Sequence, residues 1–235
     1  MDLLTTATAA DERERASSIA VLPVGSFEQH GDFLPLITDT IVSCVIAKAV
    51  AQEYDLFLLP PITISCSQEH VGFAGTVSIR ARTLYGIIED IADSLLQSGT
   101  SRLVIVNGHG GNYVLSNVVQ ELSATRMRAA LFPGASAWAA ARVAAGMETD
   151  QHADMHAGEL ESSLLLHVDA NLVSGAYADR DHLADNRQAL LTLGMAAITE
   201  TGVVGKPSLA ESDKGRRLLT SLTEQASSVI ELLSS

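Results

Sequence analysis

Short apolar runs alternate with longer amphipathic segments along the chain. Four of these runs have the length and the aliphatic content of strands buried on both faces, and they cover residues 18–24, 56–59, 102–106 and 129–132. The second run stops at Pro60-Pro61, because proline cannot donate a hydrogen bond to a neighbouring strand.

Segments with apolar residues at helical spacing follow the predicted strands. We expect helices over about 39–53, 83–98, 114–126, 137–145, 159–168 and 211–233. Thr38 is expected to cap the first helix and Thr83 the second, and Ser98-Gly99 is expected to end the second. Residues 1–17 indicate a loosely packed start or a short helix, and residues 170–189 show no regular pattern.

Strands that alternate with helices are typical of βαβ units and a mostly parallel sheet. Because the chain has no internal repeat, low-complexity tract or linker, we expect residues 1–235 to form a single α/β domain. Sites in such sheets form at the carboxyl ends of the strands. The loops that follow residues 18–24 and 102–106 are therefore expected at the same edge of the sheet.

Composition and charge narrow the possible partners. Hydrophobic residues make up 47% of the chain and charged residues 18%, as in a globular domain. The net charge is −13 and no Lys/Arg cluster offsets it, so we expect no binding to nucleic acid or to a membrane. The apolar runs are too short to span a membrane, and we find no signal-peptide pattern. Cys44 and Cys66 form no CxxC pattern and are expected to be buried thiols of a cytoplasmic protein.

The loop after the first predicted strand holds a carboxylate, an imidazole and a second carboxylate within twelve residues. Glu28 and His30 are two residues apart, so on an extended segment their side chains leave the same side. Two adjacent ligands suit two neighbouring metal ions better than one. Asp39 opens the next predicted helix, and its two oxygens can bridge two metals, whereas an imidazole has one free nitrogen. These residues predict a dinuclear metal site bridged by Asp39.

A glycine-rich turn, Asn107-Gly108-His109-Gly110-Gly111-Asn112, follows the third predicted strand. Its glycines allow the backbone to approach a metal or a substrate closely. His109 is thus a candidate ligand, although a tight turn with an incidental histidine fits the pattern equally well. The turn is neither a Walker loop nor G-x-G-x-x-G, although a turn before a helix could also cradle a phosphate.

A third cluster contains His156, Glu159 and Glu161. His156 and Glu159 share a face if the helix begins at His156. Glu161 then points elsewhere, unless His156 lies on the loop before the helix. Acidic residues are also favoured in a first helical turn by the helix dipole alone, but the small neighbours of His156 leave its ring accessible.

Other conspicuous residues have simpler interpretations. His70, near a glycine loop, either lines a pocket or hydrogen-bonds the loop. Trp138, the only tryptophan, is expected to pack in the core rather than to stack on a substrate. His167 and His182 are interpreted as structural, and no serine has a G-x-S-x-G context.

Together the three clusters resemble the creatininase (creatinine amidohydrolase) family. The resemblance covers most of the chain, through residues 23–31, 34–36, 38–40, 69–76, 107–112, 156–163, 202–205 and 211–215. It implies a three-layer α/β/α sandwich and a centre of two divalent metal ions, zinc, manganese or iron. It also implies hydrolysis of carbon–nitrogen bonds in amides, with a small amide or a short peptide as substrate, and a ring-shaped homohexamer.

The resemblance also assigns roles to residues. By position, Glu28 and His109 would bind one metal, His30 would bind the other, and Asp39 would bridge them. His156 matches the histidine that the family is thought to use for proton transfer, and an acid near it such as Glu159 could orient it.

The chain departs from creatininase itself at two places. Creatininase has a metal-binding glutamate where this chain has Gly111, so the missing ligand must be Glu159 or Glu161. We favour Glu161, since a glutamate is usual there in members with the double glycine. Asp32-Phe33 replaces the Pro-His of many relatives, which alters the pocket wall and leaves the substrate open. The double glycine is similar to that of the mycofactocin-type peptidase and formamide deformylase branches.

Two other functions are compatible with parts of the pattern. A non-catalytic metal-binding scaffold of the same fold would explain Gly111, because a lost second ion would weaken catalysis. A phosphate- or nucleotide-binding domain would use the turn at 108–112, but it leaves the neighbouring acids unexplained. A metal-dependent amidohydrolase accounts for all three clusters.

Overall fold

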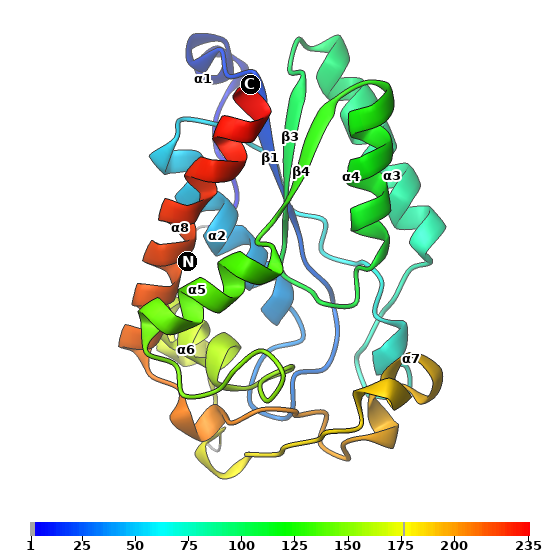
Figure 1. The fold of residues 1–235 in the computed structure, drawn as a ribbon, viewed down its shortest axis with the longest axis vertical. Coiled ribbons are helices and arrows are strands. Elements are labelled where there is room, and N and C mark those ends of the chain that lie inside the picture. The colour runs from blue at the N-terminus through cyan, green and yellow to red at the C-terminus, as the bar shows by residue number, and fades with distance from the viewer. Residues whose placement is uncertain (1–2, 176) are drawn as a thin grey trace.

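A four-stranded parallel sheet forms the centre of the computed structural model, which describes residues 3–175 and 177–235 (Figure 1). The strands run in the order β2-β1-β3-β4, and every pairing between them is parallel. Their bounds are Ile19–Val24 for β1, Phe57–Leu58 for β2, Arg102–Asn107 for β3 and Arg128–Phe132 for β4. The four predicted strands are thus confirmed, and β2 is shorter than predicted.

Helices cover both faces of this sheet. Helices α3 and α4 lie on one face, and α2, α5, α6 and α8 lie on the other (Figure 1). The helices are α1 Ala9–Arg15, α2 Thr38–Glu53, α3 Ala81–Gln97, α4 Val114–Thr125, α5 Ala135–Ala145, α6 Glu159–Val168, α7 Leu190–Leu193 and α8 Ser212–Ser234. The predicted three-layer α/β/α sandwich is confirmed.

Each face of the sheet has its own apolar core. Successive side chains of a strand point to opposite faces, so Leu22 packs with the α3 and α4 side chains while Val21 packs with those of α2 and α8. Both side chains are at most 1% exposed. This double burial explains why β1 is an unbroken apolar run rather than an alternating one.

Two predicted helix caps are wrong. Helix α2 begins at Thr38 itself, whose hydroxyl donates to the carbonyl of Pro35 at 2.7 Å. Helix α3 begins at Ala81, before Thr83, and the residue that precedes it is Arg80. The predicted end of α3 is confirmed, because Gly99 follows Ser98 in the left-handed region with φ of 93°.

The loops after β1 and β3 meet because these strands are neighbours, with Val24 paired to Asn107. Both loops contain a glycine packed against the start of α2. A Cβ atom on Gly25 would lie 2.3 Å from the Cα of Thr40, and one on Gly108 would lie 2.2 Å from the carbonyl oxygen of Asp39. This close approach brings the first turn of α2 between the two loops.

Candidate metal centre

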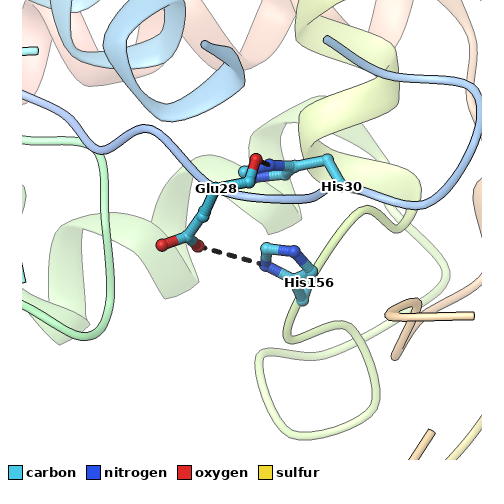
Figure 2. Close-up of side chains that lie close together, drawn as sticks. All are labelled: Glu28, His30 and His156. Atoms are coloured by element: carbon cyan, nitrogen blue, oxygen red, sulfur yellow. Dashed lines mark hydrogen bonds and ion pairs between the residues drawn. The ribbon is translucent and has the colours of Figure 1, made fainter. Parts of the chain in front are cut away.

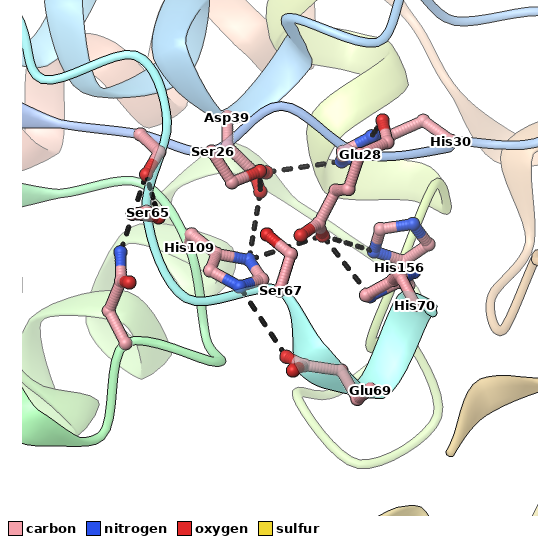
Figure 3. Close-up of polar contacts among 12 residues, drawn as sticks. Ser26, Glu28, His30, Asp39, Ser65, Ser67, Glu69, His70, His109 and His156 are labelled. Atoms are coloured by element: carbon pink, nitrogen blue, oxygen red, sulfur yellow. Dashed lines mark hydrogen bonds and ion pairs between the residues drawn. The ribbon is translucent and has the colours of Figure 1, made fainter. Parts of the chain in front are cut away.

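Buried acidic and histidine side chains converge at the carboxyl ends of β1 and β3 (Figure 3). Glu28, Asp39 and His109 form one group whose ligand atoms all lie within 4.8 Å of one another. His30, Asp39 and Glu161 form a second group of the same kind. Asp39 belongs to both groups, so the five residues predicted as ligands lie together in the fold.

The two oxygens of Asp39 face two different imidazoles. Oδ1 lies 3.1 Å from Nε2 of His30, and Oδ2 lies 2.9 Å from Nδ1 of His109. Oε1 of Glu28 lies 3.2 Å from the same nitrogen of His109. Oε2 of Glu161 lies 3.9 Å from Nε2 of His30. The first group is therefore the tighter of the two.

Backbone carbonyls fix the tautomers of both imidazoles. Nδ1 of His30 lies 3.0 Å from the carbonyl oxygen of Glu28, and Nε2 of His109 lies 2.7 Å from that of Cys66. A carbonyl oxygen only accepts hydrogen bonds, so these two nitrogens carry the protons. In the neutral rings, the other nitrogens direct lone pairs at carboxylate oxygens. Such a contact is favourable only when a proton or a metal ion lies between the two atoms.

The pKa shifts also indicate that the cluster attracts cations. Burial opposes protonation of His30, but the Asp39 carboxylate raises its pKa to about 9. Burial also opposes protonation of His109, and Glu28 and Asp39 raise its pKa well above the usual range. Burial alone would raise the pKa of Asp39, yet His30 and His109 hold it well below its usual value.

Glu28 supplies the strongest sign that divalent ions fit here. Both of its carboxylate oxygens are buried and have no hydrogen-bond partner among the described residues. A buried carboxylate without such partners is costly. Imidazole nitrogens and carboxylate oxygens are ligands of zinc and of other divalent transition metals. The residues present therefore fit a metal centre, with Glu28, His30, Asp39, His109 and Glu161 as available ligands.

His156 faces this cluster with a free nitrogen. Its Nε2 lies 2.6 Å from the carbonyl oxygen of Gln29 and donates to it, so Nδ1 carries the lone pair. Nδ1 lies 3.8 Å from Oε1 of Glu28 (Figure 2). Burial, with the neighbouring His30 and His70, lowers the pKa of His156 well below its usual value. In this tautomer the unprotonated Nδ1 faces Glu28 and is the ring atom that can accept a proton.

Glu159 lies away from His156, in a separate buried ion pair. Its carboxylate accepts from Nζ of Lys214 at 2.7 Å and from the hydroxyl of Thr149 at 2.6 Å. None of its contacts in the described part of the chain reaches His156, so they give no support to the predicted orienting role. They instead connect the first turn of α6 to the first turn of α8.

The start of α6 explains why Glu161 and Glu159 separate. The helix begins at Glu159, and His156 lies on the preceding loop, where its backbone pairs with Val204. Residues two apart on a helix point about 200° apart, so one acid faces Lys214 and the other faces the cluster. Oε2 of Glu161 accepts from the amide of Ala157 at 2.6 Å, and burial raises the pKa of its carboxyl to about 7.

The sequence did not reveal the residues that hold Glu28. Nε2 of His70 lies 3.1 Å from Oε1 of Glu28. Nδ1 of His70 lies 2.9 Å from the side-chain amide nitrogen of Gln29. That amide is oriented by two further bonds, because its oxygen accepts from Gly31 and its nitrogen donates to the carbonyl of Gly202. Gln29 therefore donates to Nδ1 of His70, so the proton of a neutral His70 ring is on Nε2, the nitrogen that lies nearer to Glu28. His70 lies 41 residues from Gln29, and no spacing signal connects them.

Glu69 occupies the space beside Gly111. A Cβ atom on Gly111 would lie 1.8 Å from Oε1 of Glu69 and 2.4 Å from Nε2 of His109. The same Glu69 oxygen lies 3.4 Å from that nitrogen of His109. The double glycine thus admits a carboxylate from another segment, which sequence analysis did not single out.

A cavity of about 460 Å³ opens onto the cluster. Its lining includes Asp39, His109, His156 and Glu161 from the cluster, together with Trp138 and Arg187. Trp138 also packs partly against the core, which is the role expected for it. His182, interpreted as structural, hydrogen-bonds the carbonyl of Ile198. Cys44 and Cys66 are free and buried, as expected.

The parallel α/β/α sandwich holds candidate metal-ligand groups beneath a cavity, and its match to a family of amidohydrolases makes the chain a hydrolase that acts on carbon–nitrogen bonds. The family model for creatininase, described as creatinine amidohydrolase, matches residues 3–230, and the chain belongs to this family. None of the helices in residues 3–175 and 177–235 is long and apolar enough to cross a membrane.

Relatives with different names match different shares of the chain. The mycofactocin precursor peptide peptidase of Mycolicibacterium smegmatis is 34% identical over 217 residues, which cover 87% of this chain and 81% of the relative. The creatinine amidohydrolase of Pseudomonas putida is 34% identical over 99 residues, which cover 40% of this chain and 38% of the relative. A crystal structure of creatinine amidohydrolase superposes with a TM-score of 0.82 at 22% identity, over 98% of this chain and 97% of that one. This last match concerns the fold.

Proposed function

We propose that the protein is an amidohydrolase that uses two divalent metal ions, zinc, manganese or iron, to cleave a carbon–nitrogen amide bond with water. The observation that carries this proposal is that Asp39 belongs to two groups of candidate metal ligands, one with Glu28 and His109 and one with His30 and Glu161. Glu28 and His109 would hold one ion, His30 and Glu161 the other, and Asp39 both. Bound there, the ions would lower the pKa of a coordinated water from about 16 toward about 7 and would polarise the amide carbonyl.

The chain's own residues supply the proton transfer. His156 is held by the carbonyl of Gln29 and offers Nδ1 toward Glu28. It accepts a proton at this atom as water attacks, and it returns the proton to the leaving nitrogen. A positioned acid–base group of this kind contributes about 10²- to 10⁴-fold to a rate. Gln29 orients the ring of His70 by a hydrogen bond, and Nε2 of that ring lies 3.1 Å from Oε1 of Glu28.

A short peptide is the substrate that we favour among linear amides, cyclic amides and formamides. The relatives named as peptidases align over most of their length, whereas the relative named creatinine amidohydrolase aligns over 38% of its length. A cavity of about 460 Å³ is within the usual range for small-molecule sites. We also propose a homohexamer, for which light scattering of the purified protein would give a mass six times 24.8 kDa.

The test combines metal counting with a substrate panel. Elemental analysis of the purified protein should find two divalent ions per chain. Short peptides, formamides and lactams should include at least one substrate whose hydrolysis stops on chelation and returns when metal is restored. The competing hypothesis is a non-catalytic scaffold, motivated by Gly111. One ion or none, with no hydrolysis after metal loading, would favour the scaffold.

A further inference from the structure

Arg187, in the cavity wall, forms no direct ion pair with a described residue; burial lowers its pKa, and the Asp150 carboxylate opposes that shift. Arg187 lies in the short 3-10 helix Arg187–Ala189 and lines the cavity with the metal-ligand cluster. Its Nη2 donates to the carbonyl of Gln151 at 2.7 Å and to that of His152. Its Nε is buried and has no hydrogen-bond partner in the described part of the chain. No ion pair between described residues includes Arg187.

Arg142, in the same wall, has an acidic partner, although its Nε is likewise buried without a hydrogen-bond partner among the described residues. Its Nη1 donates to Oδ2 of Asp154 at 2.8 Å and its Nη2 to the carbonyl of Asp154 at 3.1 Å. The Asp154 carboxylate also accepts the amides of Glu159 and Leu160, at 2.7 and 3.0 Å. Both oxygens of the Asp154 carboxylate therefore already accept hydrogen bonds, from Arg142 and from the first amides of α6. Arg187 remains a partly desolvated cation in a chain whose net charge is −13.

We propose that Arg187 binds a carboxylate of the substrate. The Nη1 group of Arg187 makes no hydrogen bond within the described residues, and a carboxylate in the cavity can accept from it as a charge-assisted partner. The cavity also bounds this site with apolar side chains, those of Leu190, Leu191 and Met195. The moiety that carries the acid thus has an apolar body. This inference rests on the proposed function and defines its substrate class as an amide with a free acid near the scissile bond.

Such a carboxylate has two sources in a peptide, the C-terminus and an acidic side chain. The probes are N-acetylated tripeptides prepared as free acids and as C-terminal amides, each with Asp or with Asn at the middle position. We expect the wild-type protein to favour either the free acids over the C-terminal amides or the Asp peptides over the Asn peptides. The expected preference is about ten- to a hundredfold in kcat/KM. An effect of amidation identifies the C-terminal carboxylate, and an effect of Asn identifies the side chain.

The Arg187→Gln variant separates this role from a structural one. It should lose the preference through a higher KM for the charged peptides, while its kinetics with the neutral peptides stay within a few-fold of wild type. If Arg187 had only a structural role, Arg187→Gln would lower kcat/KM for the charged and for the neutral peptides to the same extent. Arg187→Lys, which keeps the charge, should retain part of the preference. Arg128→Gln removes one positive charge from an exposed position on β4 and should retain all of it.

Failure of this inference differs from failure of the proposed function. Equal turnover of charged and neutral peptides by the wild-type protein would overturn the role of Arg187 and leave the hydrolase intact. If no peptide is cleaved, calorimetric titration with the same peptides decides the matter directly. Tighter binding of a charged form that Arg187→Gln abolishes supports the inference, and equal binding of all forms refutes it.

Discussion

Replacing Asp39 by asparagine removes one negative charge from the point where the two ligand groups meet. The side chain is 1% exposed, and its oxygens lie 3.1 and 2.9 Å from imidazole nitrogens of His30 and His109. A divalent ion about 3 Å from a carboxylate oxygen interacts by on the order of 10 kcal/mol at an effective dielectric constant of about 20. If water replaces half of this interaction, each ion binds roughly 4,000-fold more weakly.

The metal that stays bound after gel filtration measures this loss. Wild-type protein and Asp39→Asn are loaded with zinc or manganese, separated from free metal by gel filtration, and analysed for metal content. We expect the variant to retain neither ion, because Asp39 serves both groups. Asp213→Asn is the matched control, since it removes the same charge from an exposed position at the start of α8. Retention of both ions by Asp39→Asn would refute the bridging assignment, and loss of a single ion would show that Asp39 serves only one group.

Three further predictions follow from neighbouring contacts. His156→Ala should keep both ions and lose about 10²- to 10⁴-fold in kcat; unchanged kcat in a steady-state assay would exclude its role in proton transfer. Glu159→Gln should lower the free energy of unfolding in urea by about 2–4 kcal/mol, because it leaves the buried Lys214 ammonium without its carboxylate, and metal content should not change. The metal-free protein should lose stability as the pH rises from 6.5 to about 9, because His30 carries a raised pKa only when folded. Thermal melts across this range should therefore decline, and a rise would show that the ring is not held protonated.

Local pattern was sufficient for most of the fold. The apolar runs predicted the strands because strands covered on both faces need no polar alternation. The first residues of the helices were harder to predict from the sequence. The hydroxyl of Thr38 looks like a cap in sequence, but in the fold it reaches back to Pro35. That contact depends on the path of the preceding loop, which residue spacing does not encode.

In the candidate site, too, some residues could be predicted from their spacing in the sequence and others could not. Glu28, His30 and Asp39 stand close together in the chain, so their spacing could suggest a shared site. The preference for Glu161 over Glu159 came from the family resemblance, and the predicted helix over 159–168 agrees with α6, which begins at Glu159 and leaves His156 on the preceding loop. The bond from Gln29 to Gly202 joins positions 173 residues apart. Arg187 likewise gained its significance from the cavity it lines.

Anomalous diffraction from a crystal of the metal-loaded protein tests the central claim most directly. The account predicts two peaks about 3.5–4 Å apart, with Asp39 between them, Glu28 and His109 on one peak, and His30 and Glu161 on the other. A single peak, or two peaks that do not share Asp39, would contradict it.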